Sequence, residues 1–198
     1  MRLFKSLALK YVAMAILPLG VLLWQPAVNF TVLALGERVL LQTRPLDPRD
    51  FLRGDYVTLH YDIADIPEDL LPKEAMLPNE DENAAVRSGW RRIEGTFYRD
   101  IYVTLKPDGE GIGSVSGVSL ARPSGGLYLK GSLYWRWGSF NVDYGLGVYY
   151  VPEGTGRAIE IAVQTGDVLA DVRIFKGRGV LKSLEVPESA RQEDEDLM

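Results

Sequence analysis

The chain has 198 residues and a formal net charge of −5 at pH 7, so we expect no nucleic-acid partner, because such partners bind basic surfaces. It has no cysteine, which excludes disulfides, thiolate metal sites and cysteine nucleophiles together. The 20 glycines, 10 tyrosines and 4 tryptophans favour a β-rich fold with many turns.

An apolar segment without a charged residue runs from Tyr11 to Gly36. A helix that crosses a bilayer needs about 20 mostly apolar residues, so the segment predicts a transmembrane helix, with its best span from about Leu7 to Trp24. Basic residues precede it: Arg2, Lys5 and Lys10. The positive-inside rule therefore predicts that Met1 lies in the cytoplasm and that the chain beyond Gly36 lies outside.

Two other interpretations of this segment stay open. A cleaved signal peptide shares the basic start and the apolar core, but small residues are poorly placed for cleavage around Trp24-Gln25-Pro26-Ala27. A buried core helix rarely runs this long without a charge. We expect an uncleaved anchor, residues 1–36 including a short cytoplasmic stub, that binds the lipid bilayer.

Turn-forming residues follow the first predicted exterior strand, 38–43. Asp47 suits an N-cap, Pro48 suits the first helical position, and Gly54 suits a left-handed stop. We therefore predict a single helical turn from Pro48 to Arg53, followed by a strand from Asp55. Apolar and polar residues alternate along that strand, so one face takes Val57, Leu59, Tyr61 and Ile63 and the other takes Tyr56, Thr58, His60 and Asp62.

The rest of the exterior part reads as short strands separated by turns. Residues 64–83, with several prolines and acidic residues, predict an exposed loop. Further strands are predicted at 95–105, 113–122, 127–137, 140–150, 157–165, 170–175 and 179–186. The fold class is therefore mainly β, with an N-terminal transmembrane helix and an antiparallel β-sandwich or barrel-like domain over residues 37–186. Residues 187–198 are too acidic to bury and predict a disordered tail.

Two blocks of the sequence carry a family resemblance. The first contains Asp47, Pro48, Arg49, Asp50, Arg53, Gly54, Asp55, Tyr56, Leu59 and Tyr61. The second runs from Tyr144 to Gly156, a tyrosine-rich strand and loop that is followed by Glu160 and contains Tyr149, Tyr150, Pro152, Glu153, Gly154 and Gly156. Together with the anchor, they resemble the GDYXXLXY family of bacterial proteins. The resemblance implies a membrane-anchored domain outside the bacterial cytoplasmic membrane. It implies no catalytic residue and no cofactor, because the family has no established activity.

Several carboxylates are open to a functional interpretation: Asp47, Asp50, Asp55 and Glu153. Close carboxylates bind hard cations or perform acid–base chemistry, but capping and turn roles explain the three aspartates more simply, so we expect no metal site. Arg49 and Arg53 are four residues apart on the predicted turn and share a face. We expect one of them to pair with Glu153, which would bring the two blocks together.

The single histidine and the aromatic strands complete the candidates. His60 lacks cysteine partners for a zinc site, so we expect a half-exposed strand position. Some aromatic residues could form a binding platform for sugar or peptide, although core packing explains them as well: Trp135, Trp137, Tyr144, Tyr149 and Tyr150.

The anchor and the Gly54-Asp55 pair are faintly similar to the type I signal peptidases, which would make the chain an enzyme. No serine lies just upstream of Pro48, where Pro45 occupies the position it would need, and no lysine lies in the following strand, so the serine–lysine dyad is missing. We expect a non-enzyme with a structural or accessory role that binds another envelope or membrane protein. A binding module for a small ligand, glycan or peptide, and a hydrolase that uses carboxylates, are the alternatives.

Overall fold

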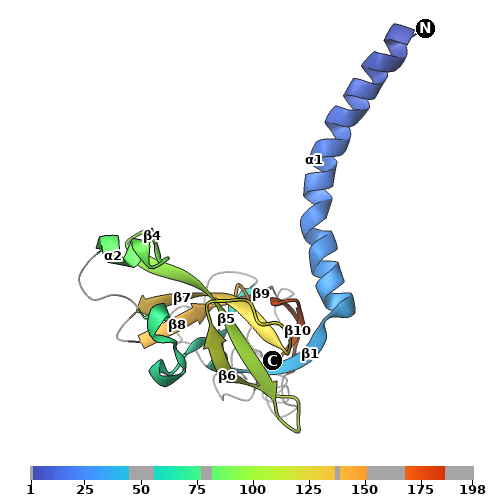
Figure 1. Cartoon of the computed structure of the whole chain (residues 1–198). Helices are drawn as coiled ribbons and strands as arrows, with labels where there is room; N and C mark the ends of the chain where they lie inside the picture. The colour runs from blue at the N-terminus through green and yellow to red at the C-terminus, as the bar shows by residue number, and fades with distance from the viewer. Residues whose placement is uncertain (1, 45–55, 77–81, 137–138, 151–167, 186–198) are drawn as a thin grey trace.

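The computed structural model describes residues 2–44, 56–76, 82–136, 139–150 and 168–185 (Figure 1). Its regular elements are α1 (Arg2–Leu35), β1 (Glu37–Arg44), β2 (Tyr56–Thr58), β3 (His60–Tyr61), the 3₁₀ turns η2 (Asp62–Ala64), η3 (Glu68–Leu70) and η4 (Lys73–Ala75), α2 (Glu82–Arg87), β4 (Arg91–Ile93), β5 (Thr96–Pro107), β6 (Gly113–Ser119), β7 (Tyr128–Arg136), β8 (Ser139–Asp143), β9 (Val148–Tyr150), β10 (Leu169–Phe175) and β11 (Arg178–Glu185).

Helix α1 projects from the β domain as one long, curved helix (Figure 1). It continues through Pro18 and Pro26, which each remove a backbone donor and favour bending. The stretch Ile16–Leu35, 20 residues, is apolar and long enough to cross a membrane, and almost all of it is exposed. This stretch begins and ends later in the chain than the span predicted from the sequence, about Leu7 to Trp24.

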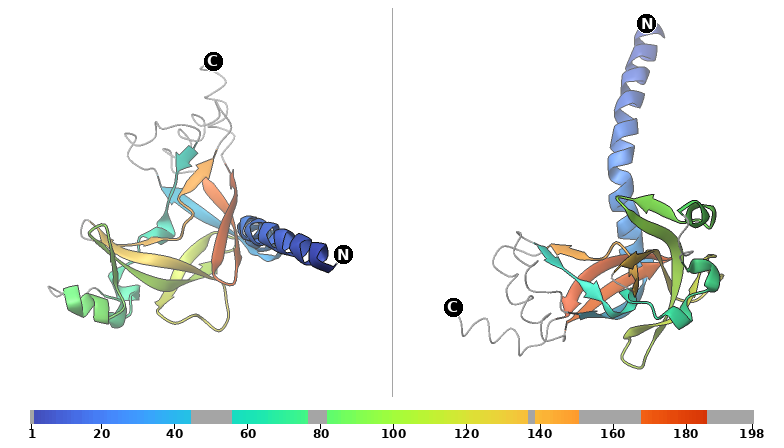
Figure 2. Two further views of the ribbon diagram at one scale, coloured as in Figure 1. Left: turned by 90° about the horizontal axis from the view of Figure 1, so that it is seen from above. Right: turned by 90° about the vertical axis from the view of Figure 1, so that its left-hand side faces the viewer.

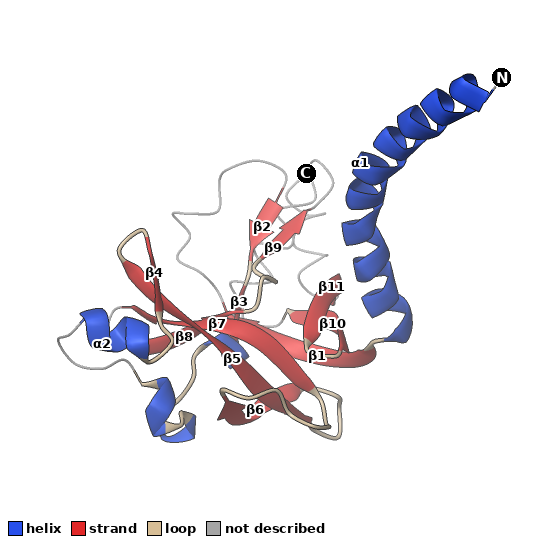
Figure 3. Ribbon diagram, turned by 45° about the horizontal axis from the view of Figure 1, so that its top comes forward, coloured by secondary structure: helices blue, strands red, loops and turns tan. Residues whose placement is uncertain are grey.

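Two antiparallel sheets form the domain, with a two-stranded ribbon beside them (Figures 2 and 3). One sheet has the order β11-β10-β1-β3, and the ribbon pairs β2 with β9. The other has the order β4-β5-β7-β8, and β6 pairs with β5 on the same edge as β4. Long strands β5 and β7 curl around the core (Figure 3). The prediction of a mainly β, antiparallel sandwich or barrel-like domain after an N-terminal apolar helix is confirmed.

The core lies between the inner faces of these sheets. Alternate residues point inward along β10, where Ala170, Val172 and Ile174 are buried. Along β5, Ile101 and Val103 are likewise fully buried. Other fully buried side chains come from the neighbouring elements: Val39, Leu41, Trp90, Leu129, Leu133 and Val168.

Helix α1 joins β1 without a linker. Val32, one turn before the helix end, is buried at 2% exposure, and its carbonyl accepts a hydrogen bond from the Gly36 amide at 2.8 Å. A Cβ at Gly36 would lie 3.0 Å from the Ile174 nitrogen, so the turn is packed directly on β10. Just beyond it, the Arg38 guanidinium binds the buried carboxylate of Asp171 at 3.0 Å. The strands β10 and β11 lie beside the base of the helix (Figure 2), so helix and domain form a tight joint.

The segment predicted as an exposed loop, 64–83, is in part core. Ile66, Leu71 and Ala75 are each buried to 5% exposure or less, between short 3₁₀ turns that begin after Pro67 and Pro72. The prediction was wrong for this stretch because it took the prolines and the acidic residues as signs of exposure. Isolated apolar side chains anchor the stretch to the domain, although its apolar residues do not repeat with the period of a helix or a strand.

Two predicted strands are each divided between different sheets. The strand from Asp55 breaks at Leu59, so β2 pairs with β9 whereas β3 pairs with β1. The strand predicted over 140–150 breaks where Gly145 takes a φ of +70°, which separates β8 from β9. The predicted turn at 48–53, the strand at 157–165 and the tail at 187–198 lie outside the described residues.

Candidate functional site

The two sequence blocks of the family resemblance meet in a two-stranded antiparallel ribbon. Strand β2 pairs with β9 in the register Tyr56↔Tyr150, Val57↔Tyr149 and Thr58↔Val148. The contact continues where the ribbon ends, because the Leu59 amide donates to the Gly147 carbonyl at 2.8 Å. Backbone hydrogen bonds therefore hold the blocks together in the described part of the chain.

Two tyrosines extend this contact in opposite directions. The Tyr61 hydroxyl donates to the Leu146 carbonyl at 2.9 Å, and the Tyr144 hydroxyl donates to the Ile63 carbonyl at 2.7 Å. Tyr61 of the first block thus binds the backbone of the second block, and Tyr144 of the second block binds the backbone two residues after the first. Burial raises the pKa of both hydroxyls well above the ordinary value for tyrosine, so both stay neutral donors at any physiological pH.

Next to these tyrosines lies a cleft of about 420 Å³, which we call the junction cleft. Its walls include Leu59, His60 and Tyr61 from the first block and Tyr144, Leu146 and Gly147 from the second. Strands β5 and β7 contribute Tyr98 and Tyr134, whose ring centroids lie 5.7 Å apart. The junction of the two blocks is therefore also the wall of a concave, aromatic surface.

The rim of the junction cleft carries an unusual residue in a hairpin turn. Glu94 lies between β4 and β5 with a φ of +48°, and the next residue, Gly95, has a φ of +86°. Two-residue turns of this kind favour asparagine or aspartate before the glycine, because both positions need a left-handed backbone. Glu94 is therefore not the residue that the turn favours, and its side chain places a carboxylate at the rim of the cleft. Asp143 adds a second carboxylate to the wall.

His60, which also lines the cleft, takes part in a charged network. Its Nε2 atom lies 3.3 Å from Oδ1 of Asp65, and Oδ2 of Asp65 binds Arg44 at 2.8 Å. Arg44 also binds Asp62 at 2.6 Å. His60 is 30% exposed, which agrees with the half-exposed strand position expected from the sequence. The network ties the end of β1 to the turn after β3.

Most of the residues of the two blocks lie outside the described residues: Asp47, Pro48, Arg49, Asp50, Arg53, Gly54, Asp55, Pro152, Glu153, Gly154, Gly156 and Glu160. The predicted pair between an arginine and Glu153 therefore stays a prediction, and so does a hydrolase built on the carboxylates. Within residues 2–44, 56–76, 82–136, 139–150 and 168–185, no group of three His, Cys, Asp or Glu side chains is placed to hold a metal ion.

Three block residues that the structure describes, Leu59, Tyr61 and Tyr149, contribute to the core of the domain. Leu59 and Tyr61 are buried at 4% and 3% exposure. Tyr149 packs against the core from β9, beside Tyr150 in the same strand. The residues that complete the junction cleft, Tyr98 and Tyr134, had no signal in the sequence, because only the register of β5 with β7 brings them together.

The aromatic residues considered as a platform are used in different ways. Tyr144 and Tyr149 pack against the core, and Tyr144 also binds a backbone carbonyl. Trp135 packs edge-on against Phe140 with ring centroids 4.6 Å apart, and 37% of it is exposed. Trp137 lies outside the described residues. These contacts favour cross-strand packing for the three described side chains.

An apolar helix long enough to cross a membrane, joined to a β domain whose two tyrosine-bearing blocks pair, defines a class of small proteins with one N-terminal helix and one β domain. Within this class, the chain belongs to the GDYXXLXY protein family, whose profile matches residues 18–184 and so includes both blocks. No curated protein and no solved structure matches the chain.

Proposed function

We propose that this chain is a single-pass protein of the bacterial cytoplasmic membrane. Met1 lies in the cytoplasm and the β domain lies outside. The basic residues before the apolar span support this orientation, because the two residues directly after it, Glu37 and Arg38, carry no net positive charge.

The absence of cysteine from the chain makes this topology easy to test. Ser6→Cys places a thiol in α1 before the apolar span Ile16–Leu35, and Ser116→Cys places one at an exposed position of β6. In intact spheroplasts, a membrane-impermeant maleimide is expected to label Ser116→Cys at once and Ser6→Cys only after permeabilisation. Labelling of Ser116→Cys only after permeabilisation would contradict the proposal.

We propose further that the domain has an accessory, non-catalytic role: it binds another membrane protein of the envelope. The observation that carries this proposal is the tight joint between α1 and the domain. Val32 is buried, Gly36 packs on β10, and Arg38 binds Asp171 on the same strand. A domain held in this way keeps one orientation and one height above the bilayer, which suits docking on a neighbouring membrane protein.

The junction cleft is the surface that we assign to this partner. Ile93 at its rim is an apolar side chain with 53% exposure, and the paired rings of Tyr98 and Tyr134 lie in its wall. Exposed apolar and tyrosine side chains of this kind are typical of interface centres. The carboxylates of Glu94 and Asp143 favour a partner segment that carries basic residues.

A helical-phase experiment tests whether the rigid joint matters for the partner. Two alanines inserted after Leu23 would turn the helix before the insertion by about 200° relative to the domain, whereas four would turn it by about 400°, close to the original face. If the partner contacts both helix and domain, co-purification from mild detergent is lost with two alanines and retained with four. Equal co-purification of both variants would contradict a role for the fixed geometry.

A second candidate function is supported by the walls of the same cleft. Four tyrosines, a histidine and two carboxylates around about 420 Å³ also suit a short peptide or glycan. Tyr98→Ala would then abolish the thermal stabilisation that short cationic peptides or oligosaccharides give to the full-length chain in detergent. The absence of any stabilisation with the unmodified chain would remove this candidate and leave the protein partner.

A further inference from the structure

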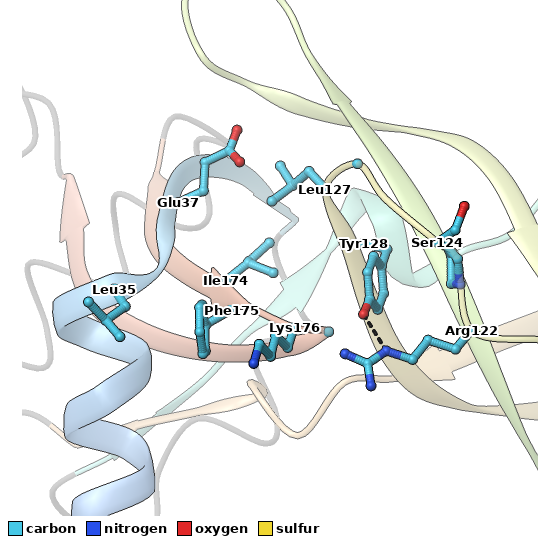
Figure 4. A pocket seen from close by; sticks show the side chains of 12 residues that line it. Leu35, Glu37, Arg122, Ser124, Leu127, Tyr128, Ile174, Phe175 and Lys176 are labelled. Carbon is cyan, nitrogen blue, oxygen red and sulfur yellow. Dashed lines mark hydrogen bonds between the residues drawn. The ribbon is translucent and has the colours of Figure 1, made fainter.

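The face of the domain next to the end of α1 carries two adjoining clefts. The first, about 560 Å³, is lined by Leu35 of the helix and by Arg122, Tyr128 and Lys176 (Figure 4). The second, about 510 Å³, shares Arg122 and Lys176 and adds Arg178. We call the region of Arg122, Lys176 and Arg178 the basic cleft.

Glu37 also lines the first cleft (Figure 4), but within the part of the chain that the structure describes no carboxylate forms an ion pair with Arg122, Lys176 or Arg178. Arg122 donates from Nε to the Tyr128 hydroxyl at 2.7 Å, and its guanidinium lies 5.9 Å from the centre of that ring. Lys176 lies with Nζ 5.2 Å from the centre of the Phe175 ring. The neighbouring Lys130, in contrast, is paired with Asp100 at 2.8 Å. The cleft therefore presents oriented cations that favour an anionic group.

Lys176 holds its position at a conformational cost. It has a φ of +51° and precedes Gly177, with a φ of +86°, in the two-residue turn between β10 and β11. Asparagine is the favoured residue at such a position, because it tolerates a left-handed backbone better than a lysine does. Gly177 packs on Tyr128, where a Cβ would lie 2.5 Å from the ring, so the turn is fixed in place. A strained residue in a fixed turn at a cleft points to a role for its side chain.

The basic cleft lies at a defined depth relative to the proposed membrane span. The span Ile16–Leu35 has 20 residues, and a helix of about that length covers roughly 30 Å, the thickness of the hydrocarbon core. Leu35 therefore marks the end of the hydrocarbon, and it also lines the first cleft. In Figure 4, the Lys176 ammonium and the Arg122 guanidinium lie at the lower side of the cleft, the side on which α1 extends away from the domain. This is the level of the lipid headgroups.

We propose that the basic cleft binds the phosphate of an anionic phospholipid headgroup in the leaflet next to the domain. Arg122 and Lys176 bind the phosphate oxygens, Arg178 adds charge, and the acyl chains lie beside Leu35. The proposal rests on anchoring by α1 and is independent of the protein partner. If α1 instead crosses the bilayer earlier, over Leu7–Trp24, the cleft stands well above the headgroups and no such binding occurs.

Native mass spectrometry of the full-length chain in mild detergent tests this binding, with phosphatidylglycerol or phosphatidylcholine added at equal concentration. The unmodified chain is expected to retain phosphatidylglycerol preferentially. Lys176→Asn and Arg122→Gln are each expected to lower its retention about fivefold, the factor that one basic residue near an anionic surface provides. Lys106→Gln, at an exposed lysine on β5 outside the cleft, is expected to leave retention unchanged.

The variants and inorganic phosphate distinguish lipid binding from unfolding of the domain and from binding of free phosphate. Lys176→Asn keeps the turn that asparagine favours, so a loss of lipid with an unchanged or higher melting temperature cannot come from unfolding. Inorganic phosphate alone is expected to leave the melting temperature unchanged, whereas phosphatidylglycerol raises it. Equal retention of both lipids by the unmodified chain, equal retention of phosphatidylglycerol by the cleft variants, or an equal shift with inorganic phosphate would overturn the proposal. The thiol-labelling experiment reports the anchoring separately.

Discussion

Tyr61 and Leu146 are joined by a buried hydrogen bond of 2.9 Å although 85 residues separate them in the chain. The tyrosine belongs to the first block of the family motif, and the carbonyl belongs to the second block. This bond and the β2–β9 pairing hold the two blocks of the motif together inside the domain. The described motif side chains therefore serve the architecture that forms the junction cleft.

Tyr61→Phe is expected to destabilise the domain by about 1–3 kcal/mol, because it leaves the Leu146 carbonyl buried without its donor. Denaturant unfolding of the full-length chain in detergent measures the loss. Tyr102→Phe is the control, since the ring of Tyr102 is half-buried and packs edge-on against Tyr128. An equal loss for the two variants would show that the Tyr61 hydroxyl has no special role.

Alkaline pH is expected to unfold the domain through Tyr61 and Tyr144. Burial raises the pKa of both hydroxyls in the folded state above the ordinary value of about 10. Their contribution to stability is therefore complete below pH about 10 and is lost as pH rises toward the folded pKa values, by about 1.4 kcal/mol per pH unit for each group.

The double variant Tyr61→Phe, Tyr144→Phe removes both of these titrating groups. Its free energy of unfolding is expected to be lower at neutral pH and to fall less steeply above pH about 10. Urea unfolding at a series of pH values gives the two slopes. Identical slopes for the unmodified chain and the double variant would exclude these tyrosines as the cause.

Gly131→Ala is expected to destabilise the domain by about 1–3 kcal/mol through overpacking. A Cβ at this position of β7 would collide with Val142 and lie 3.0 Å from Cδ1 of Tyr144. Gly117→Ala, on β6, is a matched control, because its Cβ would meet nothing within 4 Å. Melting temperatures of the two variants compare them directly, and a smaller loss for Gly131→Ala than for Gly117→Ala would contradict the packing described.

The sequence predicts individual strands well because burial of one face imposes a period of two. Leu59, Tyr61 and Ile63 lie on the predicted buried face and are each at most 4% exposed. The same alternation continues when a strand leaves one sheet for another, so the break at Leu59 has no local signal. Its two neighbours, Gly147 and the β1 strand, are distant in sequence and are fixed only by the whole topology.

The candidate site is less predictable than the strands. The pairing of Tyr98 with Tyr134 depends on the register between β5 and β7, and the basic cleft depends on a helix end, a loop and a hairpin turn coming together. The strained turn residues Glu94 and Lys176 each precede a glycine. A charged residue before glycine in a tight hairpin is the one sequence signal that could have indicated both clefts.

A photo-crosslinking amino acid at Ile93 tests most directly whether the junction cleft binds a membrane protein. Ile93 is 53% exposed at the rim of the cleft, and the same probe at the exposed Ser114 of β6 is the control. In intact cells, the Ile93 probe is expected to give one discrete adduct with a membrane protein, and the Ser114 probe none. Adduct formation at both positions alike, or at neither, would contradict docking of a partner at the junction cleft.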